Sequence, residues 1–271
     1  MAVSKQRWMV LILVAICMAV VVSAIPMLLS VIGHARDASN WARCAANLQQ
    51  IGLALQSYHE VHGSYPPAYI CDRSGKPILS WRVLILPDLQ HHDVYSKVRF
   101  DEPWNGPHNI RLAASMPACY RCPTDSGAQI GETSYVAVIG AETLWPGAAS
   151  RRVTDIARSR STVIQVVETA NARISWMEPR DVALANVLHD YGAVRGRHPC
   201  GGGDELFRGV YDGYSPSAVG YRIRGANCVV ATGAVVAISE AASPKLLKGL
   251  LSVAPFDFGP YEGDKGDSRI H

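Results

Sequence analysis

The chain has 271 residues, of which 26 are Lys or Arg and 23 are Asp or Glu, so its formal net charge is +3. The basic residues are spread along the chain and form no block, which argues against a nucleic-acid-binding surface. With 48% hydrophobic residues, the part after the N-terminal apolar run is large enough for one sizeable core or two small ones.

The segment 8–33 contains no charged residue and is longer than the roughly 20 residues needed to cross a membrane. Lys5 and Arg7 precede this run, whereas Arg36 and Asp37 follow it. Because cytoplasmic flanks carry the excess of positive charge, we expect a membrane anchor at 1–33 with its N-terminus inside and the rest of the chain exported.

Cleavage by signal peptidase is the alternative reading of the same segment. Small residues end at Ala24, where such a cut would fall, and the product would be a secreted protein. The apolar character continues through residues 25–32, which a signal peptide does not need, so an uncleaved anchor is favoured. Pro26 predicts a kink in this helix because it removes one backbone hydrogen bond.

A stalk helix is predicted over residues 34–63, because apolar residues recur at spacings of three and four. Gly63 suits the position after the last helical residue, and Pro66 and Pro67 prevent continuation. The apolar stripe needs a partner, which is either the rest of the chain or the same helix of a second copy. Its members are Ala38, Trp41, Ala45, Leu48, Ile51, Leu55 and Tyr58.

An exported head is expected over residues 64–258, followed by a disordered tail over 259–271. Runs rich in β-branched residues predict strands within 132–140 and 161–169. Residues 174–177 are expected to form another strand, and residues 78–89 fit either a strand or a short helix.

The last part of the head is predicted to contain a hairpin over residues 221–239, with its turn at Thr232-Gly233. A helix capped by Asp181 is expected over 181–191, and a helix started by Ser243 and Pro244 is expected to follow the hairpin. The order of elements indicates an α+β fold, in which an antiparallel sheet packs against the long N-terminal helix. The glycine-rich residues 195–216 are expected to form a surface loop.

Several motifs resemble the domain of unknown function 1559 family, which is abundant in planctomycetes. The opening match is "CAANLQQIGLALQSYHEVHGSYPPAYI" from Cys44. Further matches are "SWRVLILPDLQHHDVY" from Ser80, "FDEPWNGPHN" from Phe100, "CPTD" from Cys122, "TSYVAVIG" from Thr133, "VVE" ending at Glu168 and "WMEPRD" from Trp176. The resemblance implies a type IV pilin-like or pseudopilin-like exported protein with no established activity and no cofactor.

Two departures from the family pattern change what this resemblance implies. The prepilin-peptidase signal, Gly followed by Phe-Thr-Leu-x-Glu, is replaced by "SKQRWMVLILV" from Ser4, so processing and pilus assembly are not implied. The family also tends to end with His, nine residues and Asp-Gly. Here "RHPCGGG" from Arg197 is followed by an insertion at 200–224, and Thr232 stands where the family has Asp.

Cysteines other than Cys17 fall in the part predicted to be exported, and their even number in an oxidising compartment predicts disulfides of undetermined connectivity. These six are Cys44, Cys71, Cys119, Cys122, Cys200 and Cys228. The resemblance implies a bond between Cys44 and Cys122, because the family often has cysteines at both places. A bond between Cys200 and Cys228 would then tether the insertion.

Metal and redox readings of "CYRC" at Cys119–Cys122 are disfavoured. Pro123 and the strand-like context do not fit a redox motif that opens a helix. A zinc site would need a second pair of ligands from His198, Cys200 and Cys228, whose spacing matches no zinc ribbon. We therefore predict no metal ligand.

Catalytic candidates are His198 with Cys200, the pair His91-His92, and the carboxylates Glu168, Glu178 and Asp181. Since Arg180 lies between Glu178 and Asp181, a structural ion pair is favoured over paired catalytic carboxylates. The tryptophans at 81, 145 and 176 are expected to pack in the head, whereas Trp104 is a possible binding residue.

The sequence therefore predicts a single-pass protein of the cytoplasmic membrane with its head in the periplasm or an equivalent space. It is expected to act as a structural or interaction protein without catalytic activity, and to associate through its stalk helix or with other envelope proteins. The alternatives are an extracytoplasmic ligand-binding module that uses Trp104, a cleaved secreted protein, and a thiol-dependent enzyme that uses Cys119, Cys122 or His198. The ligand of such a module is unknown.

Overall fold

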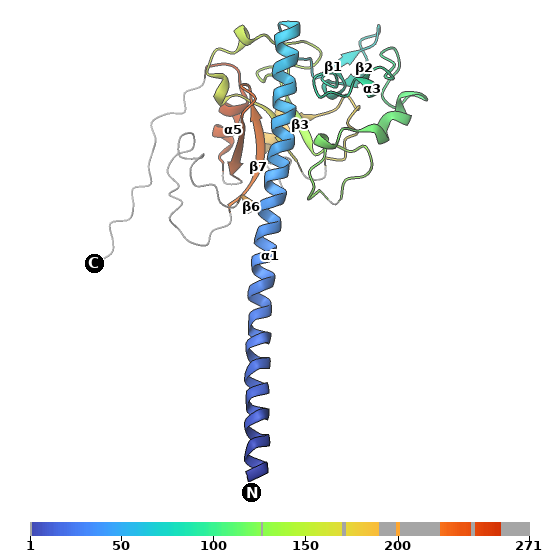
Figure 1. Ribbon diagram of the computed structural model, residues 1–271. Helices are drawn as coiled ribbons and strands as arrows, with labels where there is room; N and C mark the ends of the chain where they lie inside the picture. Colours follow the sequence, from blue (N-terminus) through green and yellow to red (C-terminus); the bar gives the residue numbers. More distant parts are fainter. Residues whose placement is uncertain are drawn as a thin grey trace, which may run out of the picture. The chain divides into compact units, whose positions relative to one another are not determined.

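The structure is a computed structural model that describes residues 2–125, 127–169, 172–189, 199–200, 223–239 and 242–255 (Figure 1). Predictions for His198, the glycine-rich stretch and the C-terminal tail lie outside these residues, as does the side chain of Cys200. The chain divides into two compact units, residues 1–40 and residues 41–271.

Helix α1 runs from Ala2 to His62 and continues through Pro26. It ends where the sequence predicts: Gly63 has φ +71°, and its N–H donates to the carbonyl of His59 at 2.8 Å. Glycine accepts this left-handed conformation without the steric penalty of a Cβ atom, so it closes the helix at low cost.

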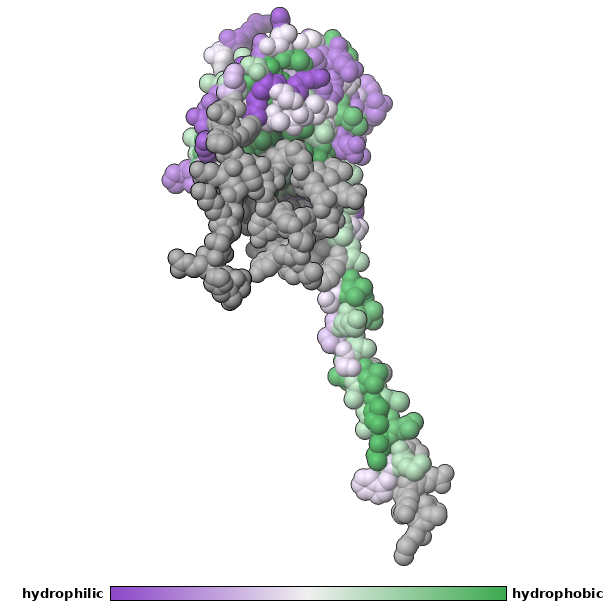
Figure 2. All heavy atoms as spheres, turned by 90° about the vertical axis from the view of Figure 1, so that its left-hand side faces the viewer, coloured by the Kyte–Doolittle hydropathy of each residue, from purple (hydrophilic) through white to green (hydrophobic). Residues whose placement is uncertain are grey.

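The first unit consists of the N-terminal part of α1. The described side chains from Trp8 to Ile32 are exposed, and Figure 2 shows this stretch covered with hydrophobic residues. Within the described part of the chain, α1 is the one helix long and apolar enough to cross a membrane, by length and composition.

The second unit is built around a six-stranded sheet in the order β5-β3-β4-β7-β6, with β8 also paired to β7. The β3–β5 pair is parallel, and the other pairs are antiparallel. The strands are β3 (Tyr135–Ile139), β4 (Ile164–Glu168), β5 (Val182–Ala183), β6 (Pro199–Cys200), β7 (Ile223–Val230) and β8 (Val235–Ser239).

The C-terminal part of α1, from Trp41 onward, packs on one face of this sheet. Its buried side chains Leu48, Ile51 and Leu55 share a core cluster with Ala137 of β3 and Val229 of β7. The rest of the chain is therefore the partner of the apolar stripe from Leu48 to Leu55. The arrangement is α+β and pilin-like, as predicted, with a sheet that is mainly antiparallel.

The opposite face of the sheet is covered by α4 (Leu184–His189) and α5 (Pro244–Leu251). Leu247 and Leu250 of α5 lie in a second core cluster with Val136, Val138 and Val230. Alternate residues of β3 thus point to opposite faces, as a period of two requires. The sheet separates α1 from α4 and α5.

The β7–β8 hairpin confirms the predicted turn, with Gly233 at φ +83°. Its tip is attached to the end of α1, because the carbonyl of Ala231 accepts hydrogen bonds from Gln56 Nε2 and the Tyr65 hydroxyl, each at 2.9 Å. Polar contacts therefore fix the hairpin to the helix next to the apolar core.

Shorter elements lie between α1 and β3 and between β3 and β4 along the chain. They are β1 (Tyr69–Cys71), which pairs with β2 (Pro77–Ser80), α2 (Trp81–Leu84), α3 (His92–Tyr95), and the 3-10 turns η1 (Asn109–Ser115), η2 (Ala118–Tyr120), η3 (Val153–Asp155) and η4 (Arg160–Thr162). The ambiguous segment 78–89 thus continues strand β2 and then enters a helix. The change occurs at Ser80, whose Oγ accepts from the N–H of Arg82.

Two local predictions are wrong. Residues 174–177 form no strand: Ser175 makes one isolated bridge to Glu132, and the N–H of Trp176 binds the carbonyl of Gly131. Asp181 does not cap a helix, because α4 begins at Leu184, after β5. Its carboxylate binds groups far away in the sequence instead.

Candidate functional site

The core contains a buried ion pair between Arg82 of α2 and Asp181, which precedes β5. Arg82 Nη2 lies 2.5 Å from Asp181 Oδ1, and the two side chains are 0% and 1% exposed. The sequence analysis considered only residues close to Asp181 in the sequence as its partners. It therefore missed Arg82, which is 99 positions away.

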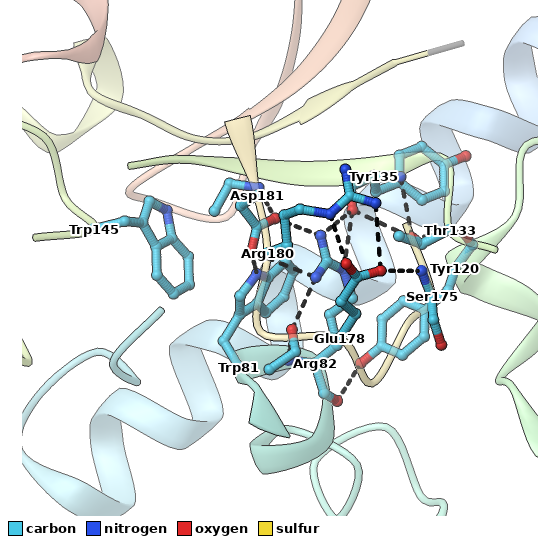
Figure 3. A network of polar contacts seen from close by, with 12 residues as sticks. Trp81, Arg82, Tyr120, Thr133, Tyr135, Trp145, Ser175, Glu178, Arg180 and Asp181 are labelled. Carbon is cyan, nitrogen blue, oxygen red and sulfur yellow. Dashed lines mark hydrogen bonds and ion pairs between the residues drawn. The ribbon is translucent and has the colours of Figure 1, made fainter. Parts of the chain in front are cut away.

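Both members of this pair have further hydrogen bonds. Arg82 donates to the carbonyl of Tyr135 from Nε and Nη2 and to Ser80 Oγ from Nη1. Asp181 accepts from the N–H of Ala137 at 2.8 Å and from Trp81 Nε1 at 3.2 Å. Figure 3 shows the Asp181 carboxylate directed toward Trp81 and Arg82.

The environment of this pair indicates a structural role. Burial raises the pKa of Asp181, and the neighbouring Arg82 guanidinium opposes this rise. A catalytic acid or base needs to reach a substrate, whereas these groups are enclosed by backbone and by the Trp81 and Trp145 rings, whose centroids lie 5.1 Å apart. The pair joins α2, β3 and the start of β5.

Glu178 forms a separate and more exposed pair with Arg180. Arg180 Nε lies 2.6 Å from Glu178 Oε1, and the two side chains are 53% and 18% exposed. Arg180 also donates to the carbonyl of Arg173. Glu178 accepts from the N–H of Ser175 (Figure 3). The expected structural ion pair is present, and Asp181 is not part of it.

A second polar cluster lies between α1 and the sheet. One ligand atom each of Cys44, Cys122 and Glu168 lies within 4.8 Å of the other two, and all three residues are buried. Cys44 belongs to α1, Cys122 follows η2, and Glu168 ends β4. The structure therefore brings together the two cysteines that the resemblance pairs.

Two members of this cluster are hydrogen-bonded to neighbouring residues. Asn227 Nδ2 donates to Glu168 Oε2 at 2.9 Å, and the N–H of Cys122 donates to Ser134 Oγ at 3.0 Å. A hydrogen bond with Cys122 and burial raise the pKa of the Cys44 thiol well above its ordinary value. Two thiolates and a carboxylate could also bind zinc, so these residues are the place where a metal would fit.

Cys119 does not belong to the cluster of Cys44, Cys122 and Glu168. It lies in η2 and is buried, and this burial raises the pKa of its thiol from 9.0 to about 12. A redox cysteine has a lowered pKa and partial exposure, so Cys119 lacks both features.

The predicted bond between Cys200 and Cys228 is not supported by the strand register. The backbone of Cys200 pairs with Ile223, five positions before Cys228 on β7. At about 3.3 Å per residue this is roughly 16 Å along the strand, whereas disulfide Cα atoms lie within about 7 Å. The sequence could not show this, because the pairing of β6 with β7 is set by the fold.

The remaining candidates lie in loops and turns. Trp104 is half-buried and packs against the core, and its N–H donates to the carbonyl of Ile78. Its predicted role in binding stays a prediction. His91 precedes α3 and His92 begins it. The tryptophans at 81, 145 and 176 are buried in the core, as expected.

Sequence comparison gives one finding about relatives. A profile described as "Protein of unknown function (DUF1559)" matches residues 33–219. A comparison with curated proteins and one with solved structures found no match.

Proposed function

Since the chain belongs to the DUF1559 family, whose activity is not established, we propose that it is a membrane-anchored, pilin-like structural or interaction protein of the cell envelope. In this proposal residues 1–33 anchor the chain, the N-terminus stays in the cytoplasm, and the head is exported. The protein acts by holding its head at the membrane surface, without catalysing a reaction.

The observation that carries the proposal is the continuity of α1. Its N-terminal part exposes apolar side chains from Trp8 to Ile32, and its C-terminal part supplies core residues such as Leu48 and Ile51. Exposed apolar surface of this extent favours a hydrocarbon environment. An anchor joined by a flexible linker would not contribute to the head's core, whereas here one helix carries both the exposed apolar stretch and these core residues.

Self-association belongs to this proposal, but its surface differs from the one first expected. Leu48, Ile51 and Leu55 are buried against the sheet and are not available to a second copy. Ala46 and Leu53 lie on the exposed side of α1, and Leu53 is 60% exposed. In the proposed protein, contacts between copies use this side or the membrane-embedded part.

Topology in intact cells tests the proposal. The full chain should be found in the membrane fraction, and protease added to cells with a permeable outer barrier should digest the head. Mass spectrometry of the membrane-bound protein should show a chain that begins at Met1 or Ala2. A variant with Leu13→Arg and Val20→Arg should leave the membrane fraction, because two charges at the centre of a span each cost about 3 kcal/mol.

Two results would contradict this function. A head that resists external protease in cells with an intact inner membrane is cytoplasmic. A mature chain that begins at Ile25 shows signal-peptidase release, and the protein is then secreted. A matched control, Gln49→Arg on the exposed side of α1 in the head, should change neither result.

A further inference from the structure

We infer that Cys44 and Cys122 form a disulfide that joins α1 covalently to the head. Their sulfur atoms lie within 4.8 Å of each other. An S–S bond is about 2.05 Å long, so the atoms need to approach by at most about 3 Å. Rotation about χ1 moves a cysteine sulfur over such a distance without a change in the backbone.

The fold selects this pair from the possible connectivities. Cys119 is only three residues from Cys122, but it does not join the group formed by Cys44, Cys122 and Glu168. Cys71 lies in β1, and Cys228 lies in the core cluster on the opposite face of the sheet. Among the described cysteines, Cys122 is therefore the one that the structure places beside Cys44.

The bond requires an oxidant, so the inference rests on the proposed export of the head. The oxidant is a disulfide-bearing protein or small molecule of that compartment. One thiolate attacks its disulfide, and the second thiolate then displaces the mixed disulfide. The Cys44–Cys122 bond forms, and the oxidant leaves as two thiols, which take up the two protons that the cysteines release.

Burial decides when this exchange happens. Cys44 is 0% exposed and Cys122 is 3% exposed in the folded head, so an oxidant cannot reach them there. The exchange therefore takes place during folding, before α1 settles on the sheet. The finished bond is protected from reductants by the same burial.

The bond would also link the anchoring helix covalently to the head. It connects a helix that starts in the membrane to a segment 78 positions further along the chain (122 minus 44). A covalent link would add to the apolar packing that holds α1 on the head.

Peptide mapping of the full chain from membranes tests this inference. The sample is quenched in acid, denatured and alkylated without reductant, and then cut with trypsin and a Glu-specific protease. Cleavage after Arg121 separates Cys119 from Cys122, and cleavage after Glu60 separates Cys44 from Cys71. We expect peptide 44–60 to be linked to the peptide that begins at Cys122, and the linked mass to disappear on reduction.

Variants give the matched control. Cys44→Ser and Cys122→Ser should each abolish the linked peptide and leave the other cysteine alkylated. Cys119→Ser, which changes a buried cysteine three residues away, should keep the link. A link from Cys44 to Cys71, Cys119 or Cys200 would overturn the inference.

Two further measurements separate this inference from the proposed function. The chain is also refolded in detergent in a glutathione redox buffer, where the link should form whatever its location in cells. Separate alkylation of both peptides, in the refolded chain or in a head that protease shows to be exported, overturns the disulfide. One equivalent of bound zinc that is lost in both Cys44→Ser and Glu168→Gln would overturn it too, because the cluster is then a metal site.

Discussion

The carbonyl oxygen of Gly233, in the β7–β8 turn, lies 2.7 Å from the place where a Cβ atom on Gly52 of α1 would stand. A Val229 methyl group lies 2.9 Å from the same point. Distances below 3.0 Å are shorter than real Cβ contacts, and the nearest atom belongs to the backbone, which cannot rotate away. The backbone of α1 therefore approaches the hairpin closely at Gly52, because this residue has no side chain.

Replacing Gly52 with Ala should lower the free energy of unfolding by about 1–3 kcal/mol, because the added methyl group overpacks this contact. The decrease would occur even though Ala is the better helix former by roughly 1 kcal/mol. Urea unfolding of the detergent-solubilised chain measures it. Gln49→Ala, on the exposed side of the same helix, is the control and should change stability by less than about 0.5 kcal/mol.

Gly63→Ala should destabilise the protein for a different reason. A Cβ atom here would meet no atom within 4 Å, but the residue has φ +71°. We expect a loss of about 1–2 kcal/mol from the left-handed conformation alone. Gly63→Asn should recover part of this loss, since Asn tolerates that conformation better than Ala. Equal stabilities of the Ala and Asn variants would show that φ is not the cause.

The Arg82–Asp181 pair should show strong coupling in a double-mutant cycle. Removing either partner leaves a buried charge without its counterion, which costs about 3–5 kcal/mol. Arg82→Met together with Asp181→Leu should cost much less than the sum of the single changes, because no charge is left behind. Denaturant unfolding of the four proteins gives the coupling energy.

The exposed pair provides the comparison for this cycle. Arg180→Gln should cost no more than about 1 kcal/mol, because the side chain is 53% exposed and solvent screens its charge. If Arg82→Met lowered the free energy of unfolding by as little as Arg180→Gln does, the buried pair would not be important for the stability of the head.

Cys119 should make the protein less stable at alkaline pH. Its folded-state pKa of about 12 lies above the unfolded value of 9.0, so the unfolded chain loses this proton first. This contribution to stability is fully present below pH 9 and is lost as pH rises toward 12, by up to about 1.4 kcal/mol per pH unit. Cys119→Ala should therefore lose less stability than the wild type between pH 8 and 10 in urea unfolding. Parallel pH curves for the two proteins would contradict the assignment.

Reduction should destabilise the head if Cys44 and Cys122 are linked. Closing a loop of 78 positions stabilises the folded state by about 4.5 kcal/mol in the chain-entropy estimate. Unfolding should therefore need less urea in a strong reductant, as tryptophan fluorescence can follow. In the Cys44→Ser variant the reductant should have no effect, which separates the bond from other actions of the reductant.

The sequence by itself determined the elements whose signals are local. An uncharged run of apolar residues predicts a membrane-length helix, and Gly63 followed by prolines predicts its end. β-branched runs predict β3 and β4, and Ser243 with Pro244 predicts the start of α5. Each of these depends on hydrogen bonds and side-chain preferences within a few residues, so it can be predicted before the fold is known.

Only the tertiary structure decided how distant residues meet. Asp181 is a plausible helix cap by its local sequence, but in the folded chain its carboxylate is used by Arg82, Trp81 and the N–H of Ala137. The position of Cys200 opposite Ile223 likewise follows from strand register. The position of Cys44 beside Cys122 was expected from the family resemblance, and the packing of α1 on the sheet brings the two residues together. Pairings of this kind are set by burial of the whole core, and the local sequence carries no signal for them.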